Sequence, residues 1–384
     1  MVGFVTAPSI AWGTGALEQL SGLDARRAFV VVDPAVARHE AVRRAVEELE
    51  RGGARTTVSA EPRASPTAAR VRELAGAARS FDPDWIVAIG GGTTIDAAKA
   101  LRLLLARPEL DLERRPVDVA LPGAPGPRLC AVPTTSGSGA EASWAVDLVG
   151  EDGAPFEVAD RSLVPDWALV DPFFARELPA DELVAGAFET AALATEAYLS
   201  AWANPFSDAL AADAVRQVVR RLSHALRWSD DPDARAALHY AATAAGLAHS
   251  NAQRGLAHAL ARALERPTAL RYGRLLAIVL PSVLDFDRSA ARERLETLQE
   301  VLRPADGPPP PPLPERLRRL AASVGVPLDL AAAGVDPARL REQGPRIVAE
   351  TLRSPAVLAN PRVPNEQDVR DLLERLLGGA ADRR

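Results

Sequence analysis

The residues best suited to chemistry begin with a run of glycines between two contrasting segments. The apolar run Trp85 to Gly90 leads directly into Gly91, Gly92 and Thr93, and a helical run follows from Ala97 to Leu105. Glycines between a strand and a helix let backbone amides approach a phosphate group, which the helix dipole also attracts. Glycines also form plain turns, so this run alone is weak evidence for a nucleotide site.

A second loop, Pro133 to Glu141, is dense in small residues and hydroxyl groups. It follows the apolar run Leu129 to Val132 and reads PTTSGSGAE. Hydroxyl groups and accessible amides can donate hydrogen bonds to a ribose and to phosphates. The alternative is a polar loop that simply precedes a helix.

A parallel sheet is needed to hold both loops. Through Pro172, short β-branched runs alternate with amphipathic segments, which is the pattern of parallel strands joined by crossover helices. This pattern predicts buried strands at Ala28–Asp33, Trp85–Gly90, Leu129–Val132 and Ala168–Asp171, and helices at Ala35–Arg51 and Ala68–Ser80. We therefore expect a Rossmann-like α/β domain that binds a dinucleotide at residues 1–172.

After residue 172 the strand signals almost disappear and helical periodicity takes over. Helices are predicted at Asp181–Trp202, Pro205–Leu226, Asp233–Arg266 and Leu275–Leu284, with breaks where glycine or proline occurs. These helices predict an all-α domain at residues 173–384.

Residues 303–314 form a proline-rich segment that reads RPADGPPPPPLP. Proline lacks an amide donor and fixes φ, so the segment is predicted to be neither helix nor central strand. We expect an exposed loop stiffened by polyproline II structure, with binding of a partner domain as the alternative.

The overall charge and the cysteine content exclude several classes of protein. The 384 residues carry a formal charge of −6 and no run of basic residues, which argues against nucleic acid or an anionic membrane as a partner. We see neither a secretory leader nor an apolar segment of membrane length, and therefore expect a cytoplasmic protein. Cys130 is the only cysteine and lies in an apolar run, so it is predicted to be a buried thiol.

Together the two loops resemble the nucleotide-binding signatures of the iron-dependent (group III) alcohol dehydrogenase family, GGGS-x-x-D-x-A-K and PTT-x-G-T-G-S-E. They stand here as GGGTTIDAAK at Gly90–Lys99 and PTTSGSGAE at Pro133–Glu141. The resemblance weakens after about Phe286 and before that includes VPDWALVDP at Val164–Pro172, EAYLS at Glu196–Ser200 and SNAQRGLAHALA at Ser250–Ala261. It implies the fold shared with the dehydroquinate synthases: an N-terminal Rossmann-like parallel-sheet domain and then an all-α domain, in a homodimer.

The resemblance implies a nicotinamide cofactor, NAD or NADP, that is bound by residues of both loops: Gly90, Gly91, Gly92, Thr93, Asp96, Lys99, Thr134, Thr135 and Ser138. The family also has an acidic residue beside the adenosine ribose, at the end of the second strand, and Asp33 occupies that place. A carboxylate there accepts from the ribose 2′-hydroxyl and repels a 2′-phosphate, which favours NAD over NADP. The alternative is that Asp33 caps the helix after Pro34.

The metal ligands of the family, one Asp and three His, are largely replaced. The resemblance puts the four ligand positions on Glu189, Leu193, His258 and Tyr272. A leucine cannot coordinate a metal, and a neutral tyrosine is a poor ligand for a divalent ion. Since only Glu189 and His258 remain, we expect no bound metal.

Other chemistry must then replace the metal, which in the family polarises the alcohol or carbonyl oxygen during hydride transfer. Tyr272 and His258 can serve as acid or base, and Glu189 could orient His258. Arg262 stands where the family has a further histidine near the substrate, and it can bind an anion through two hydrogen bonds. The expected catalytic residues are therefore Tyr272, His258, Arg262 and Glu189. The alternative is that His258 and Arg262 simply pair with carboxylates on neighbouring helices.

The predicted substrate is a small molecule or a peptide with an anionic group. A β-hydroxy acid fits, because its oxidation gives a β-keto acid that can lose carbon dioxide without a metal. One metal-poor group in the family looks like the dehydrogenases of daptide biosynthesis, which act on the C-terminal threonine of a ribosomal peptide in a natural-product pathway. The competing hypothesis is a non-catalytic, nucleotide-binding pseudoenzyme that scaffolds a pathway partner. A lyase or cyclase similar to the dehydroquinate synthases would need the metal ligands that are lost here.

Overall fold

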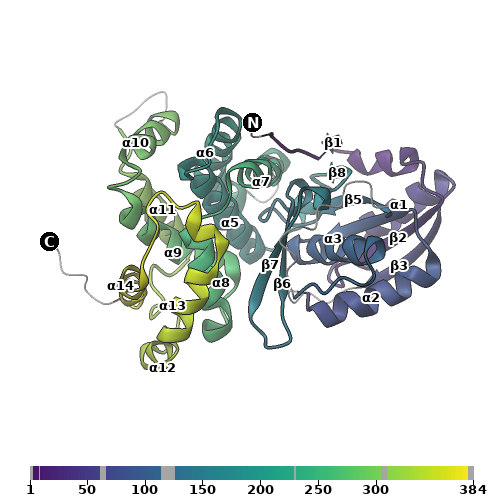
Figure 1. Ribbon diagram of the computed structural model, residues 1–384. Coiled ribbons are helices and arrows are strands. Elements are labelled where there is room, and N and C mark those ends of the chain that lie inside the picture. The colour runs from purple at the N-terminus through teal and green to yellow at the C-terminus, as the bar shows by residue number, and fades with distance from the viewer. Residues whose placement is uncertain are drawn as a thin grey trace. The chain divides into compact units, whose positions relative to one another are not determined.

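The computed structural model describes residues 3–7, 9–60, 66–113, 126–228, 231–303 and 309–378. The chain divides into two compact units, Met1–Leu178 and Pro179–Arg384. Strands occur in the first unit, and the second is built from helices (Figure 1). The short helix α4 (Phe173–Arg176) belongs to the first unit, whereas the sequence placed the domain boundary after residue 172.

A six-stranded sheet forms the centre of the first unit, with the strand order β1-β8-β5-β4-β2-β3 and parallel pairing throughout. Its strands are β1 (Ser9–Trp12), β2 (Arg27–Val32), β3 (Arg55–Ala60), β4 (Trp85–Gly90), β5 (Arg128–Pro133) and β8 (Trp167–Val170). The four predicted strands correspond to β2, β4, β5 and β8. The prediction missed the edge strands β1 and β3. β3 is mostly polar and exposed, so it lacks the apolar signal of a buried strand.

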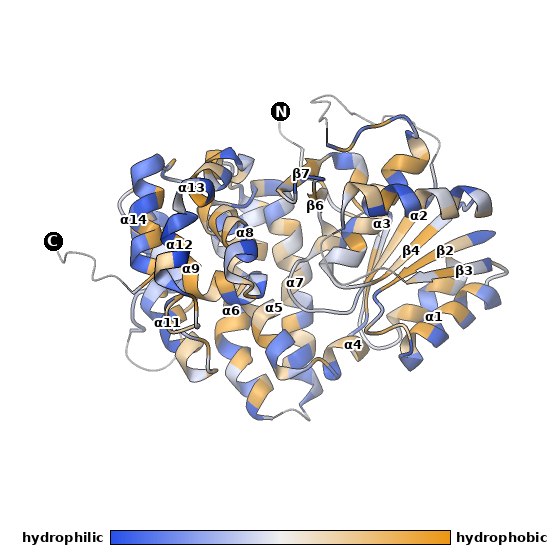
Figure 2. Cartoon of the chain, turned by 90° about the horizontal axis from the view of Figure 1, so that it is seen from below, coloured by the Kyte–Doolittle hydropathy of each residue, from blue (hydrophilic) through white to orange (hydrophobic). Residues whose placement is uncertain are grey.

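Helices cover both faces of this sheet, as the predicted α/β pattern requires. Alternate residues of β2 face opposite ways: Phe29 and Val31 pack with α2 (Ala68–Phe81) and α3 (Gly92–Ala106), and Val30 and Val32 pack with α1 (Glu40–Arg51). Figure 2 shows the hydrophobic strands β2 and β4 between α1 on one side and α2 and α3 on the other. The predicted Rossmann-like domain is confirmed.

The helix predicted at Ala35–Arg51 begins only at Glu40. The side chain of His39 accepts a hydrogen bond from the amide of Ala41, which caps the helix at that point. The preceding residues form turns after β2 instead.

An antiparallel hairpin of β6 (Ala145–Val149) and β7 (Pro155–Ala159) completes the strands of the first unit and was not predicted. Three short 3₁₀ helices lie at Ala16–Gly22, Ala140–Ala142 and Arg161–Leu163. On β5, Cys130 is fully buried, which confirms the prediction of a buried thiol, and burial raises the pKa of that thiol.

Ten helices make up the described part of the second unit: α5 (Ala180–Leu199), α6 (Pro205–Arg227), α7 (Pro232–Ala252), α8 (Leu256–Thr268), α9 (Tyr272–Asp287), α10 (Arg292–Val301), α11 (Leu313–Ser323), α12 (Pro337–Glu342), α13 (Gly344–Arg353) and α14 (Glu366–Leu376). A 3₁₀ turn lies at Pro355–Leu358. The predicted helical stretch Asp233–Arg266 is divided into α7 and α8 by a break that includes Gly255, whereas Gly246, where a break was also expected, lies within α7. The all-α second unit is therefore confirmed.

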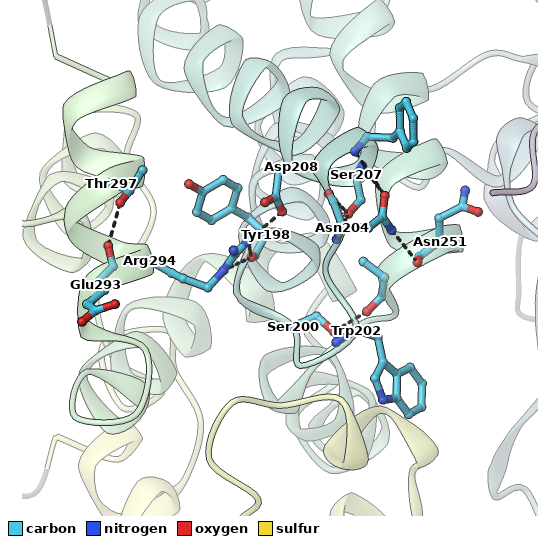
Figure 3. A network of polar contacts seen from close by, with 12 residues as sticks. Tyr198, Ser200, Trp202, Asn204, Ser207, Asp208, Asn251, Glu293, Arg294 and Thr297 are labelled. Carbon is cyan, nitrogen blue, oxygen red and sulfur yellow. Dashed lines mark hydrogen bonds and ion pairs between the residues drawn. The ribbon is translucent and has the colours of Figure 1, made fainter. Parts of the chain in front are cut away.

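The end of α5 is held by a polar network (Figure 3). The guanidinium of Arg294 donates to the backbone carbonyl of Tyr198 at 2.8 Å, pairs with Asp208 at 2.6 Å and lies 4.5 Å from the ring of Tyr198. Ser200 donates its hydroxyl hydrogen to the carbonyl of Ala252 at the end of α7. Because the last carbonyls of a helix have no partner within it, these bonds satisfy the Tyr198 carbonyl at the end of α5 and the Ala252 carbonyl at the end of α7.

The proline-rich segment is only partly within the structure, because residues 304–308 lie outside the described residues. Leu313 and Pro314 open α11, so the prediction that no part of the segment is helical is wrong at these two residues. Proline is tolerated in a first helical turn because the amide that it lacks would have no partner there. In the part of the chain that the structure describes, no helix is both long and apolar enough to cross a membrane.

Candidate functional site

In the first unit, the glycine loop joins β4 to α3. The helix α3 begins at Gly92, not at Ala97 as predicted, with Gly91 in the capping position. No side chain caps this helix start, so its first amides and the positive end of its dipole are available to an anion. The sequence placed the start too late because glycine and threonine are poor helix formers.

Glycine is required in this loop because neighbouring side chains fill the space that a Cβ atom would occupy. A Cβ atom on Gly90 would lie 2.5 Å from the side chain of Thr94. On Gly91 it would lie 3.1 Å from Thr135, and on Gly92 2.6 Å from the Ser138 hydroxyl oxygen. The two loops predicted from the sequence, Gly90–Lys99 and Pro133–Glu141, therefore pack against each other. We call them the nucleotide loops.

Asp33 lies beside the nucleotide loops, at the end of β2. Its amide donates to the carbonyl of Ile89 at 3.0 Å, and the amide of Thr134 donates to the carbonyl of Gly90 at 3.0 Å. The strand order reverses between β2 and β4, and ligands of open parallel sheets bind outside the strand ends at such a switch point. The Asp33 carboxylate also accepts from the amide of Ala35 at 2.8 Å, so it shapes the turn before α1 as well.

The hydroxyl residues of the nucleotide loops differ in exposure. Thr93 in the first turn of α3, and Thr135 and Ser138 in the second loop, are partly exposed, whereas Thr134 is buried. The structure thus brings Asp33, the three glycines and these four hydroxyl residues together at one edge of the sheet. Their contacts with a cofactor stay predictions.

Asp96 and Lys99 face the β6–β7 hairpin. The buried ammonium group of Lys99 donates to the hydroxyl of Ser143 and the carbonyl of Ala145, both at 3.1 Å. Asp96 accepts from the amide of Asp147 at 3.1 Å. These bonds anchor the hairpin to α3, which is a structural role that the sequence did not suggest. Their predicted role in cofactor binding remains untested.

In the second unit, the first candidate residues lie on one face of α5. Glu189, Leu193 and Glu196 follow at the i, i+4 and i+7 spacing of a single helix face. Leu193 is buried in the core, and Glu189 is partly exposed. The apolar residue at the second ligand position is therefore part of the packing of this unit.

The structure adds a residue that the site prediction did not include, Glu196. Its carboxylate accepts from the amides of Gly255 at 2.9 Å and Ala257 at 2.5 Å, and contacts Nδ1 of His258. It therefore caps α8 and holds His258 at the same time. The sequence shows Glu196 as the acidic residue of EAYLS. It does not show that His258 is its partner, because the two residues lie far apart in the chain.

His258, Tyr272 and Arg262 come together, and we call these three residues the helical cluster. The rings of His258 and Tyr272 are 5.9 Å apart, edge to face. The guanidinium carbon of Arg262 lies 4.3 Å from the centroid of the Tyr272 ring, within the range of a cation–π interaction. Arg262 also pairs with Glu265 at 2.8 Å on the same helix, whereas the alternative interpretation of this residue expected a carboxylate on a neighbouring helix.

A close helix crossing sets the position of Tyr272. A Cβ atom on the following residue, Gly273, would lie only 2.1 Å from the backbone carbonyl oxygen of Ala185. The backbone of α9 thus passes directly over that of α5. Only glycine fits there, and this close contact fixes the start of α9 against α5.

A second buried network supports the start of α8. The side-chain oxygen of Asn360 accepts from the amide of Leu256 at 3.0 Å, and its nitrogen donates to Asp287 at 2.7 Å. Burial raises the pKa of Asp287 to about 8, the nearby Glu196 acts in the same direction, and the Asn360 bond opposes both. Asp287 is thereby held in its neutral form at neutral pH.

The residues at the former ligand positions do not fit iron. Among the described residues, no three His, Cys, Asp or Glu side chains are grouped so that they could hold a metal ion. Leu193 is apolar, and Tyr272 carries the Arg262 cation over its ring, which repels a divalent ion. Protein sites for such ions supply three or four donor atoms. That the protein binds no metal stays a prediction.

Two family models match most of the chain. Residues 7–172 match the model described as iron-containing alcohol dehydrogenase, and residues 184–377 match the C-terminal part of the Fe-containing alcohol dehydrogenase family. An alcohol dehydrogenase of Thermococcus barophilus is 31% identical over 320 residues, which cover 81% of this chain and 82% of that protein. The structure of an iron-containing alcohol dehydrogenase from Thermococcus thioreducens is 30% identical and superposes with a TM-score of 0.89 over 98% of this chain and 100% of the other.

Other relatives include one that is named for its cofactor and several that are longer than this chain. An NADPH-dependent butanol dehydrogenase of Clostridium saccharobutylicum is 27% identical, with 97% of each chain covered. The aldehyde-alcohol dehydrogenase 2 of Entamoeba histolytica is 29% identical over 97% of this chain but only 46% of its own length. The present chain thus spans about half the length of the first curated relatives that it matches.

Proposed function

The chain belongs to the iron-containing alcohol dehydrogenase family, and on this premise we propose that it is an NAD-dependent oxidoreductase that oxidises a hydroxyl group of an anionic substrate without a bound iron. The observation that carries the proposal is the helical cluster. At positions where the family has metal ligands and a substrate-side histidine, this chain has a phenol that contacts both an imidazole and a guanidinium.

The nucleotide loops support the cofactor part of the proposal. The uncapped amides at the start of α3 would bind the pyrophosphate, and Thr135 and Ser138 would donate hydrogen bonds beside it. The Asp33 carboxylate would accept from the ribose 2′-hydroxyl and repel a 2′-phosphate, which favours NAD although one relative is named NADPH-dependent. When bound, the oxidised nicotinamide ring accepts the hydride that leaves the substrate carbon.

The helical cluster supports the substrate part. Arg262 binds a carboxylate of the substrate through charge-assisted hydrogen bonds. His258 or Tyr272 takes the hydroxyl proton, and the other group donates a hydrogen bond to the oxygen as charge develops on it. Glu189 stays a candidate for orienting the substrate or the cluster, since it shares the α5 face with Glu196.

A β-hydroxy acid is the substrate class that best suits this arrangement, and the C-terminal threonine of a peptide is one member of it. The carbinol hydrogen leaves as hydride and the hydroxyl proton goes to the protein, so the alcohol becomes a β-keto acid. Carbon dioxide then leaves, its bonding electrons remain on the α carbon, and that carbon takes up a proton. This second step needs no metal, which is consistent with the loss of the ligand set.

Turnover and metal content test the proposal together. Protein purified without chelators should contain less than one iron or zinc per chain and should form NADH with a β-hydroxy acid but not with an alcohol of equal size that lacks the carboxylate. One metal per chain would overturn the metal-free part. NAD binding without turnover on any anionic alcohol would favour the non-catalytic scaffold instead.

Three variants assign the roles within the helical cluster. Arg262→Ala should weaken substrate binding by roughly 1.5 to 3 kcal/mol, the scale of a charged hydrogen bond, and leave NAD affinity unchanged. His258→Ala or Tyr272→Phe should lower turnover by about 10² to 10⁴ if that group moves the proton. The exposed Arg266 on the same helix is the matched control, and Arg266→Ala should behave as wild type. Near wild-type kinetics for all three variants would place the chemistry elsewhere.

A further inference from the structure

We propose that Glu196 is a positioning residue that keeps the proton of His258 on Nδ1 and so leaves Nε2 as the acceptor that takes the hydroxyl proton of the substrate. This inference rests on the proposed function only for the last step, the use of His258 as the proton acceptor. The placement of the proton on the ring follows from the buried contacts of Glu196 alone.

As an ionised carboxylate, Glu196 can only accept hydrogen bonds. The side chain is 4% exposed, and its two oxygens accept from the amides of Gly255 and Ala257. Backbone amides can only donate, so both oxygens already serve as acceptors. The oxygen that receives the Gly255 amide is also the one that contacts Nδ1 of His258.

Beside an ionised Glu196 carboxylate, His258 therefore donates through Nδ1. An ionised carboxylate has no hydrogen to offer, so a ring nitrogen in contact with it is stabilised when it carries the proton. In a neutral imidazole the other nitrogen, Nε2, then has the lone pair. The neutral ring thus presents an acceptor, which suits removal of a proton from an alcohol.

The start of α8 is rigid enough to hold this arrangement. A Cβ atom on Gly255 would lie 2.9 Å from the Glu196 side chain and 2.8 Å from the Asn360 side chain, so both side chains pack directly against the backbone of Gly255. Asn360 accepts from the amide of Leu256 and is itself held by Asp287. Glu196 and Asn360 thus cap the same helix, and only the contacts of Glu196 include the imidazole of His258.

This difference provides a matched pair of variants. In Glu196→Gln, the amide oxygen can face either Ala257 or the pair formed by Gly255 and His258. Each orientation leaves one backbone amide unsatisfied, and in one of them the new NH₂ group donates to Nδ1 and moves the ring proton to Nε2. Asn360→Ser weakens the cap of the same helix without altering the contact of Glu196 with His258.

The test is the tautomer of His258, measured by nitrogen NMR on protein with ¹⁵N-labelled histidine at pH 8. Comparison with His258→Gln identifies the signals of His258 among those of the five histidines. Wild type and Asn360→Ser should show a protonated Nδ1 and an unprotonated Nε2. Glu196→Gln should show a mixture of the two tautomers, and kcat should fall about ten- to hundredfold with the Kd for NAD unchanged, the scale for removing a residue that orients a functional histidine.

The outcomes separate this inference from the proposed function. Wild-type protein with the proton on Nε2 overturns the inference without any variant. A pure Nδ1–H tautomer in folded Glu196→Gln also overturns it and reduces Glu196 to a helix cap. If the tautomers shift as expected but turnover is the same in both proteins, Glu196 still sets the ring proton and the proposed use of His258 fails.

Discussion

The nucleotide loops and the helical cluster are built from different parts of the chain. In the nucleotide loops the groups proposed to bind the cofactor are mainly backbone amides, and the glycines are needed because Thr94, Thr135 and Ser138 occupy the space of their side chains. In the helical cluster the functional groups are long side chains, and the backbone beneath them is positioned by other residues such as Glu196 and Gly273.

This difference explains why one site resembles its family and the other departs from it. A backbone site constrains almost every residue along it, since one added Cβ displaces the neighbouring loop. In a site built from side chains, residues can be exchanged while the helices stay in place. Leu193, for example, adds a buried apolar side chain to the core. We therefore expect cofactor binding to follow the family and the chemistry of the hydroxyl group to differ from it.

Among the substitutions, the largest change in stability is expected where the helical cluster itself depends on backbone. Gly273→Ala would bring a Cβ atom to 2.1 Å from the carbonyl of Ala185 and should lower the free energy of unfolding by about 3 kcal/mol. Gly76→Ala in α2 is the control, because its Cβ would meet open space and should raise the stability by about 0.5 to 1 kcal/mol. Urea unfolding of both variants measures this, and equal stabilities would refute the close crossing of α5 and α9.

A smaller effect tests whether packing between the nucleotide loops forms the cofactor site. Gly92→Ala would place a Cβ atom 2.6 Å from the Ser138 hydroxyl and should weaken NAD binding by about 2 kcal/mol. Ser138→Gly frees that space, so the double variant should bind NAD better than the sum of the two single effects predicts. Calorimetric titration of the four proteins gives the coupling, and strictly additive losses would show that the contact is irrelevant to the cofactor.

The same division governs how far the sequence could be interpreted. The strands β2, β4, β5 and β8 and the helices α5, α6 and α9 follow from apolar periodicity, and the nucleotide loops follow from glycine and hydroxyl residues next to strands. The start of α3 was misplaced because propensity there is overruled by the loop that packs on Gly91 and Gly92. Local sequence carries no trace of that contact.

Side-chain partners in the second unit were beyond the sequence for a related reason. The pairing of Glu196 with His258 joins residues on two helices separated by α6 and α7, and no periodicity encodes such a pair. We gave the orienting role to Glu189 because it stood at a ligand position, whereas the structure places the Glu196 carboxylate on the imidazole. For Lys99, a family motif was recognisable, but its bonds to Ser143 and Ala145 were not.

A pH-dependent effect is expected in the second unit from Asp287. Burial raises its pKa to about 8 from the ordinary value of 3.8, so between these values the folded protein holds a proton that the unfolded chain releases. The free energy of unfolding should therefore fall as pH rises from about 4 to 8, by up to about 1.4 kcal/mol per pH unit. Asp287→Asn keeps an oxygen for Asn360 and cannot titrate, so its stability should change less over this range. Urea unfolding of both proteins at pH 5, 6 and 7 measures this. If the free energy of unfolding changed with pH equally in both, the raised pKa of Asp287 would be contradicted.

The smallest effect concerns Asp33, the one side chain that is expected to choose between two cofactors at the backbone-built site. Its carboxylate accepts from the amide of Ala35 at 2.8 Å, and so an alanine variant would disturb both the turn and the cofactor. Asp33→Asn separates the two roles, because the amide oxygen can still accept from Ala35 while the charge that repels a 2′-phosphate is gone. Calorimetric titration should show that the wild-type protein binds NAD(H) more tightly than NADP(H), and that Asp33→Asn narrows this preference by about tenfold, close to the scale of one charged hydrogen bond. Equal affinities in the wild-type protein would leave Asp33 with a role in the turn alone, and the proposed binding of either cofactor would then depend on the backbone amides of the nucleotide loops.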